Sequence, residues 1–275
     1  MFEGCTALKN AFVIQSNLLN NYCYESMFSG CTSLTEIKME IPRNYKEITS
    51  WCTDWLKNTN VKEITLIQLE DNFINQDDYK IFNLPNNCKV NITNAFVIES
   101  CSFFKRNLYF HINEVIYYKK KTGEVWQDNW TPYNIVNGSI EFEEGQKIAF
   151  KAKKGNISFN LKNGNAILSG NIQSLMNYSN VLYPHCYQGI FKDCTSINNI
   201  SKLQLPATKL EDSCYANMFK GCLFLVQSLQ LPATELVTNC YTNMYANCDN
   251  LDNAWFNFSY HYYNDDYIYN CLPGL

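Results

Sequence analysis

The sequence lacks both a surplus of positive charge and a long apolar run. Its 22 Lys and Arg face 26 Asp and Glu, which gives a net charge of −4, and no segment offers a basic face. This balance argues against a nucleic-acid binder and against attachment to a membrane through basic residues. No uninterrupted apolar run approaches the ~18 residues that a membrane-spanning helix needs. We therefore expect that the protein neither binds nucleic acid nor inserts into a membrane.

Motifs of catalysis and metal binding are also scarce. None of the 13 cysteines forms a Cys-x-x-Cys pair, so a zinc site has little support, and no phosphate loop or nucleophile elbow occurs. The three histidines, His111, His185 and His261, have no Cys or Ser partner at a telling spacing. Glu141 and Glu143 suggest paired glycosidase carboxylates, but they alternate beside a glycine turn, which favours a solvated face. We expect no enzyme activity and no cofactor.

The N-terminus, residues 1–5, has neither a charged leader nor an apolar signal region. From this we expect either a protein that is not exported by that route or a piece of a longer chain.

What the sequence does have is a repeat. Residues 205–210 read Leu-Pro-Ala-Thr-Lys-Leu, and residues 231–236, 26 positions later, read Leu-Pro-Ala-Thr-Glu-Leu. The same shift relates the Cys-Tyr pair at 214–215 to the pair at 240–241, and residues 23–34 carry the same unit. A period shared by apolar, turn and cysteine positions is typical of a solenoid.

Each unit predicts a short strand, a turn that contains proline, and a helical turn over Cys-Tyr-x-x-Met-Phe that ends at a glycine. Strands are expected near residues 34–38, 61–66 and 203–205. We predict an α/β leucine-rich-repeat solenoid in two blocks that flank a small all-β sandwich. The predicted domains are 1–106 with a closing cap, 107–172, and 173–275.

The middle segment, 107–172, has short alternating runs separated by turn signals such as Asn163-Gly164, and these predict the sandwich. One tryptophan of the pair Trp126 and Trp130 should be buried and the other exposed. Together with Tyr133 they are our candidate ligand-binding residues. In the repeat units, by contrast, we expect the aromatic residues to fill the core, and a ligand-binding cluster of aromatic residues is the alternative.

Stacked units place equivalent residues about one strand spacing apart, on the order of 5 Å. A ladder of reduced, buried thiols is favoured over disulfides or a metal, since free cysteine packs as a small apolar side chain and the count is odd. The predicted core ladder comprises Cys23, Cys31, Cys186, Cys194, Cys214, Cys222, Cys240, Cys248, Met27, Phe28, Met218, Phe219 and Met244.

The unit Cys-Tyr-x-x-Met-Phe-x-Gly-Cys-Thr-x-Leu at 23–34, with Leu-Pro-Ala-Thr-x-Leu at 205–210 and 231–236, closely resembles the BspA-type leucine-rich repeats of gut-bacterial surface proteins. The resemblance covers roughly two thirds of the chain. The segment 107–172 looks like the small domain that precedes such repeats. The family implies non-catalytic, extracellular recognition or adhesion. The chain departs from it in lacking a leader and in beginning and ending within a unit.

The expected function is surface recognition or adhesion, with a protein or glycan ligand on a cell surface or in the mucosal matrix. The alternative is a virion component of a phage that infects gut bacteria. A homo-oligomer that stacks through uncapped solenoid ends is a further possibility.

Overall fold

The structure is a computed structural model. It describes residues 1–16, 18–42, 44–48, 50–68, 76–101, 106–112, 115–123, 125–127, 129–133, 140–153, 157–179, 181–233 and 235–252. The chain divides into two compact units, Met1–Asn94 and Ala95–Leu275, which are described separately below. The sequence-based divisions at 106 and 172 remain domain predictions. The end of the chain, 253–275, lies outside the described residues.

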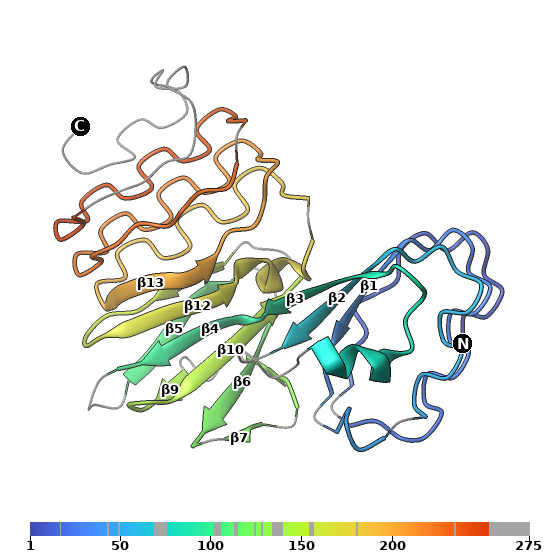
Figure 1. Cartoon of the computed structure of the whole chain (residues 1–275). Helices are drawn as coiled ribbons and strands as arrows, with labels where there is room; N and C mark the ends of the chain where they lie inside the picture. Colours follow the sequence, from blue (N-terminus) through green and yellow to red (C-terminus); the bar gives the residue numbers. More distant parts are fainter. Residues whose placement is uncertain are drawn as a thin grey trace. The chain divides into compact units, whose positions relative to one another are not determined.

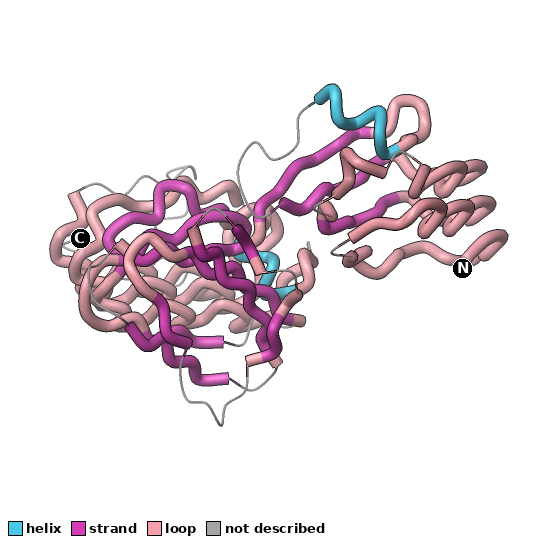
Figure 2. Tube along the Cα trace, turned by 90° about the horizontal axis from the view of Figure 1, so that it is seen from below, coloured by secondary structure: helices cyan, strands magenta, loops and turns pink. Residues whose placement is uncertain are grey.

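The solenoid is confirmed, but the predicted α/β leucine-rich-repeat fold is wrong. The protein is nearly all β, with a β-solenoid of about five turns and essentially no helix. Within the described ranges no α-helix occurs, and the Cys-Tyr-x-x-Met-Phe segments, expected to be helical, are successions of tight turns. Figure 2 shows these coils as loops.

Backbone conformation explains why the coils are not helical. In the coil at 213–221, every fourth residue, Ser213, Asn217 and Gly221, has a positive φ, between 53° and 75°. An α-helix needs right-handed φ at consecutive residues, so a left-handed residue in each group of four prevents one. Equivalent left-handed positions in the other coils are His185, Gly189, Asp193, Asn239, Asn243 and Asn247, and in the first unit Tyr22, Ser26, Gly30, Asp54 and Asn58.

The backbone N–H groups of a coil alternate between two kinds of partner. The Met218 N–H donates within its own coil to the Tyr215 carbonyl at 3.2 Å, whereas the Phe219 N–H donates to the Met244 carbonyl of the next coil at 2.8 Å. Each coil is therefore bonded to the next as a strand is bonded in a sheet. This satisfies the backbone polar groups that a buried turn would otherwise leave without partners.

The first unit contains a parallel sheet of β1 (Glu36–Glu40), β2 (Glu63–Gln68) and β3 (Lys89–Asn94), with the 3-10 helix η1 (Gln76–Phe82) before β3. β1 and β2 confirm the strands expected near 34–38 and 61–66. Their alternating side chains, among them Ile37 and Ile64, are buried together with Trp51 and Trp55. One apolar core thus runs through the coils of this unit.

The second unit combines a β-module with the C-terminal coils (Figure 1). A seven-stranded sheet has the order β13-β12-β4-β10-β6-β7, with β8 also on β6, and a three-stranded sheet has the order β11-β5-β9. The bounds are β4 (Phe96–Ser100), β5 (Arg106–Ile112), β6 (Ile116–Thr122), β7 (Val125–Trp126), β8 (Thr131–Pro132), β9 (Ile140–Phe142), β10 (Lys147–Ala152), β11 (Ile157–Asn160), β12 (Ala166–Asn171), 3-10 helix η3 (Ile172–Met176) and β13 (Ile197–Gln204).

Two features of the second unit differ from the sequence-based picture. β4 pairs with β10 and β12, so residues 96–100, which we expected to close the first repeat block, belong to the sheet of the module. The sandwich itself stays a prediction, because the described strands establish the two sheets and no more.

The module and the C-terminal coils are continuous. β12 pairs in parallel with β13, the first strand of the coils. Phe159 of β11 stacks on Phe191 with ring centres 5.3 Å apart, and Phe191 stacks in turn on Phe219 at 5.5 Å. β11 therefore occupies the place of a preceding coil and covers the apolar end of the stack.

Candidate recognition surface

The segment 125–133, which carries the candidate aromatic residues, is attached to β6 at both ends. Trp126 pairs opposite Lys121, and Thr131 pairs opposite Tyr118. The Gln127 N–H donates to the Lys120 carbonyl at 2.9 Å. Backbone pairing with β6 therefore anchors the chain on either side of Trp130.

Strand register places four lysines on one face of the seven-stranded sheet. Directly opposite residues of an antiparallel pair share a face, and alternate residues of one strand do too. Lys147 lies opposite Lys121, Ala149 opposite Lys119, and Lys151 opposite Tyr117. The other face carries Ile148, Phe150 and Ile116, which are buried in the core. We call the first face the lysine face. It comprises Lys119, Lys121, Lys147 and Lys151, together with Trp126 and Trp130.

Strand pairing brings four lysines together on this face, and one of them, Lys147, is ion-paired with Glu99. In sequence the four lysines are diluted by nearby acidic residues, and only the pairing of β6 with β10 brings them together. In the sequence, the alternate positions of Lys119 and Lys121 indicated that these two lysines share a face of a strand. Without the strand register, nothing in the sequence connected them to Lys147 and Lys151.

Trp130 is half-buried on the lysine face. The Nζ of Lys151 lies 4.4 Å from the centre of its ring, and the Nζ of Lys119 lies 5.3 Å from it. An ammonium group at this distance is attracted by the electron-rich ring face, by about 0.5–2 kcal/mol per contact. These two contacts hold the indole against the sheet while leaving part of it exposed.

Burial differs sharply among the lysines and tryptophans of this face. Lys119 and Lys121 are 7% and 8% exposed, and Trp126, opposite Lys121, is 8% exposed. Lys147 keeps 38% of its side chain exposed and forms an ion pair with Glu99 at 3.4 Å. The buried members form a packed base, and Trp130, Lys147 and Lys151 are the members that solvent and ligands can reach. Glu124 and Asp128 lie outside the described residues.

The three candidate aromatic residues are not all brought together. Trp126 is the buried tryptophan and Trp130 the partly exposed one, as the sequence predicted for the pair. Tyr133 instead donates its N–H to the Ile116 carbonyl and packs against the core. Burial raises the pKa of the Tyr133 hydroxyl. The lysine face thus has Trp130 as its exposed aromatic residue and Trp126 as its support.

The residues of the predicted core ladder are placed as follows. Cys31, Cys186, Cys194, Cys214, Cys222, Cys240 and Cys248 are buried, as are Met27, Phe28, Met218, Phe219 and Met244. Cys23 is exposed, so it is not part of the buried core ladder. Burial raises the pKa of the Cys194 thiol to about 12, so it is protonated at neutral pH. The protonated thiol is the form that packs as an apolar group.

Histidine and carboxylate side chains are dispersed. His185 and Asp212 are both about half exposed, 3.8 Å apart, and Glu141 and Glu143 are exposed. His111 lies in β5, where side chains are not described, and His261 lies outside the described residues. Across the described part of the chain, no group of three or more His, Cys, Asp or Glu residues could hold a metal ion. In the same residues, no helix has the length and hydropathy to cross a bilayer.

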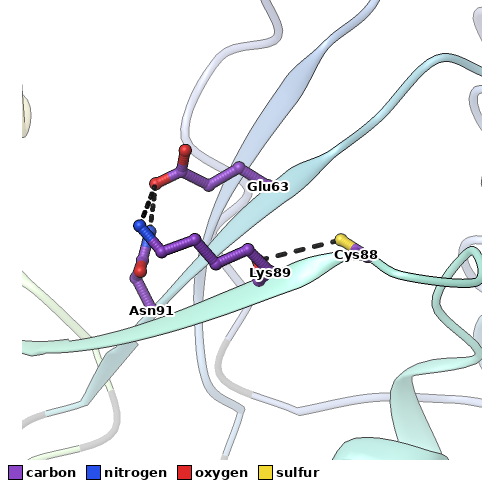
Figure 3. A network of polar contacts seen from close by, with 4 residues as sticks. All are labelled: Glu63, Cys88, Lys89 and Asn91. Atoms are coloured by element: carbon purple, nitrogen blue, oxygen red, sulfur yellow. Dashed lines mark hydrogen bonds and ion pairs between the residues drawn. The ribbon is translucent and has the colours of Figure 1, made fainter.

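The first unit has a polar network of a different kind on β2 and β3 (Figure 3). The Asn91 side-chain amide donates to the Glu63 carboxylate, and Lys89 lies 4.0 Å from the same oxygen. The Cys88 thiol donates to the Lys89 carbonyl at 3.8 Å. Glu63 and Lys89 are directly opposite each other in register, so this is a cross-strand ion pair that supports the sheet. Its charges are balanced within the network, which makes it a weaker candidate for a ligand.

Comparison of the chain with protein-family models, curated proteins and solved structures found no match. The resemblance to BspA-type repeats therefore stays a prediction from the sequence.

Proposed function

We propose that this protein is a non-catalytic recognition or adhesion protein that binds a glycan or protein ligand on a cell surface or in the mucosal matrix. The observation that carries the proposal is Trp130, a half-buried indole held on the lysine face by Lys119 and Lys151. Partly exposed aromatic residues with cationic neighbours are common binding hot spots.

Pre-organisation supports this function. A side chain that is already ordered loses little conformational freedom when a ligand binds, and immobilising a free one costs about 0.5–1.5 kcal/mol. The segment 125–133 is bonded to β6 at Trp126 and at Thr131, and Trp130 stands between these two positions. The backbone on either side of the indole is thus held on the sheet.

The coils support a scaffolding role. Their columns of stacked rings, such as Tyr187, Tyr215 and Tyr241 at 5.6 and 5.8 Å, are buried, so these rings are not available to a ligand. A stack of bonded coils is stiff along its length and suits the display of an adjoining module. The same reasoning holds whether the protein is displayed on a bacterial cell or on a phage virion, and the neighbouring genes would distinguish these two settings.

The proposal is tested by binding to immobilised panels of mucosal glycans and mucosal proteins. The wild-type chain should bind at least one panel member, and Trp130→Ala should weaken that binding about tenfold or more. The matched control is Phe224→Ala, which removes an aromatic ring that is 53% exposed on a coil, away from the lysine face. Circular dichroism checks that both variants are folded.

Two results would contradict the proposal. If the wild-type chain binds no member of either panel, it is not a recognition protein for these surfaces. If Trp130→Ala binds as tightly as the parent, the ligand contacts another part of the chain and the observation that carries the proposal is wrong.

A further inference from the structure

We infer that the first coil of the first unit carries a self-association surface, on which a second copy of this chain packs to form a closed pair. We call this surface the end face, and it comprises Phe2, Cys5, Leu8 and Phe12. Pairing is independent of the proposed recognition function, although a pair would present two copies of Trp130 to a repetitive ligand and so raise the apparent affinity.

Residues 2–8 occupy the place of a coil. The Phe2 N–H donates to the Met27 carbonyl at 2.8 Å, which is the kind of bond that joins one coil to the next elsewhere in the protein. The ring of Phe2 stacks on Phe28, with ring centres 5.5 Å apart and 6° between the ring planes. The Cys31 thiol donates to the Phe2 carbonyl at 2.9 Å. This segment therefore packs on the following coil as one more member of the stack.

The end face carries core-type residues that no described coil covers. Cys31 and Leu34 are 0% exposed, whereas their equivalents 26 positions earlier are an exposed Cys5 and a half-buried Leu8. Phe12 is 52% exposed, and the centre of its ring lies 5.9 Å from that of Phe2. Contiguous apolar side chains of this kind mark a surface that is stabilised when a partner removes it from water.

The aromatic columns of the second unit show what fits the outer side of Phe2. Phe191 is stacked on both sides, against Phe159 at 5.3 Å and against Phe219 at 5.5 Å. Phe2 has Phe28 on one side, and among the described residues no ring stacks parallel on its other side. Phe2 of a second copy would supply that ring, because a two-fold axis brings identical surfaces face to face.

Charge favours a second copy over a charged partner. Residues 1–22 contain two charged side chains, those of Glu3 and Lys9, whose charges cancel. Depletion of charge and enrichment of apolar and aromatic residues are typical of the core of a protein interface. Four of the eleven large apolar side chains that are exposed in the described part of the chain belong to this segment: Met1, Phe12, Leu18 and Tyr22. Two copies of such a surface do not repel each other.

The pair closes because the other end of the same stack is covered. The 3-10 helix η1 lies against the coil that precedes it, where the Trp55 indole N–H donates to the Phe82 carbonyl at 2.8 Å and the Cys52 thiol to the Ile81 carbonyl at 3.2 Å. Phe82 itself is 0% exposed. A contact between two identical surfaces stops at two copies, whereas contacts between different surfaces can continue into a filament.

Molar mass as a function of concentration tests this pairing. Sedimentation equilibrium of the full chain covers about 5 μM to about 500 μM, a range suited to micromolar dissociation constants. A reductant is present so that exposed thiols do not cross-link. The apparent mass should rise from the 32.0 kDa of one chain and level off at twice that value.

Two substitutions assign the pair to the end face. Phe2→Ser and Phe12→Ser should each weaken association about tenfold or more, as expected for aromatic residues near the centre of an interface. Phe12 is 52% exposed, so its substitution keeps the test valid if Phe2→Ser disturbs the packing on Phe28. The matched control is Phe224→Ser, which removes an exposed ring of the second unit and should leave association unchanged.

Three results would overturn the pairing. The mass of a single chain at every concentration would mean that the end face binds no second copy. A mass that keeps rising beyond two chains would replace the closed pair with an open series of copies. A pair that persists in both Phe2→Ser and Phe12→Ser would place the contact elsewhere. The panel experiment above decides the recognition function independently of all three.

Discussion

The Cys222 thiol donates a hydrogen bond to the backbone carbonyl oxygen of Phe191, one coil earlier, at 3.2 Å. The same bond recurs along the stack, from Cys248 to Phe219 at 3.1 Å. It also reaches into the β-module, because Cys194 donates to Phe159 of β11 at 3.1 Å. The repeated cysteine is therefore an apolar filler that also satisfies a carbonyl of its neighbour.

The first prediction concerns thiol reactivity. In the native protein iodoacetamide should modify the exposed Cys5 and Cys23, while the buried coil thiols, such as Cys222, react more than about 100-fold slower. Reaction of a buried thiol requires the stack to open, and opening a core costs several kcal/mol. Peptide mapping by mass spectrometry measures each site. Equal labelling of Cys222 and Cys23 without denaturant would show that the cysteines of the core ladder are accessible to solvent.

The second prediction is a loss of stability at alkaline pH. The Cys194 pKa is raised by burial from 9.0 to about 12, so the folded thiol keeps its proton over a range where the unfolded one loses it. The unfolded chain then binds fewer protons, and the free energy of unfolding falls as pH rises from 9 towards 12. Each such thiol contributes up to about 1.4 kcal/mol per pH unit.

Urea unfolding at pH 8, 9 and 10, with a reductant present, measures this slope. Cys194→Ala should have a shallower slope than the parent, and Cys23→Ala, which removes an exposed thiol, should have the same slope as the parent. An unchanged slope in Cys194→Ala would mean that other groups cause the alkaline loss.

The third prediction tests the left-handed positions. Asn217 has a φ of 56°, which is the left-handed region. Alanine adopts this conformation less readily than asparagine, so Asn217→Ala should lower the free energy of unfolding by about 1–2 kcal/mol. Asn217→Gly should cost less than about 1 kcal/mol, since glycine adopts positive φ freely. Lys220→Ala in the same coil is the control, with an expected change within about 0.5 kcal/mol. Equal losses for the Ala and Gly variants at 217 would refute this account.

These left-handed positions also explain how far the fold could be read from the sequence. The repeat itself was visible, because Cys214 and Cys240 recur with their neighbours at one spacing. The secondary structure of the unit was not, since a turn that recurs every four residues places Cys214 and Met218 on one side, as a helix does. Asn217, Asn243 and Asn247 were the distinguishing signal, because asparagine favours left-handed φ and is a poor residue for a helix interior.

The candidate surface was likewise visible only in part. Trp126 and Trp130 are conspicuous in the sequence, and their division into a buried and a partly exposed residue could be expected. The lysine face could not, because Lys121 and Lys147 are brought together by strand register, which is set by packing over the whole sheet.

The last prediction is that the β-module and the C-terminal coils unfold as one body. Phe159 stacks on Phe191 of the first coil at 5.3 Å and contacts Phe96 and Phe150 of the large sheet at 5.6 and 5.4 Å. Its N–H donates to the Ile190 carbonyl at 2.8 Å. Phe159→Ala should therefore lower the free energy of unfolding by about 3–5 kcal/mol. The loss should reach both sides, because the ring belongs to one core shared by sheet and coils.

Hydrogen exchange followed by mass spectrometry tests this, since it reports the sheet and the coils in separate peptides. In Phe159→Ala, amide protection should fall together in residues 147–152 and in residues 214–222, whereas Phe224→Ala should leave both unchanged, as its ring is exposed. If the coils keep their protection while the sheet loses it, the stack is stable without the module. In that case β11 is a neighbour of the first coil and does not serve as its cap, because a cap that is removed must expose the apolar end of the stack.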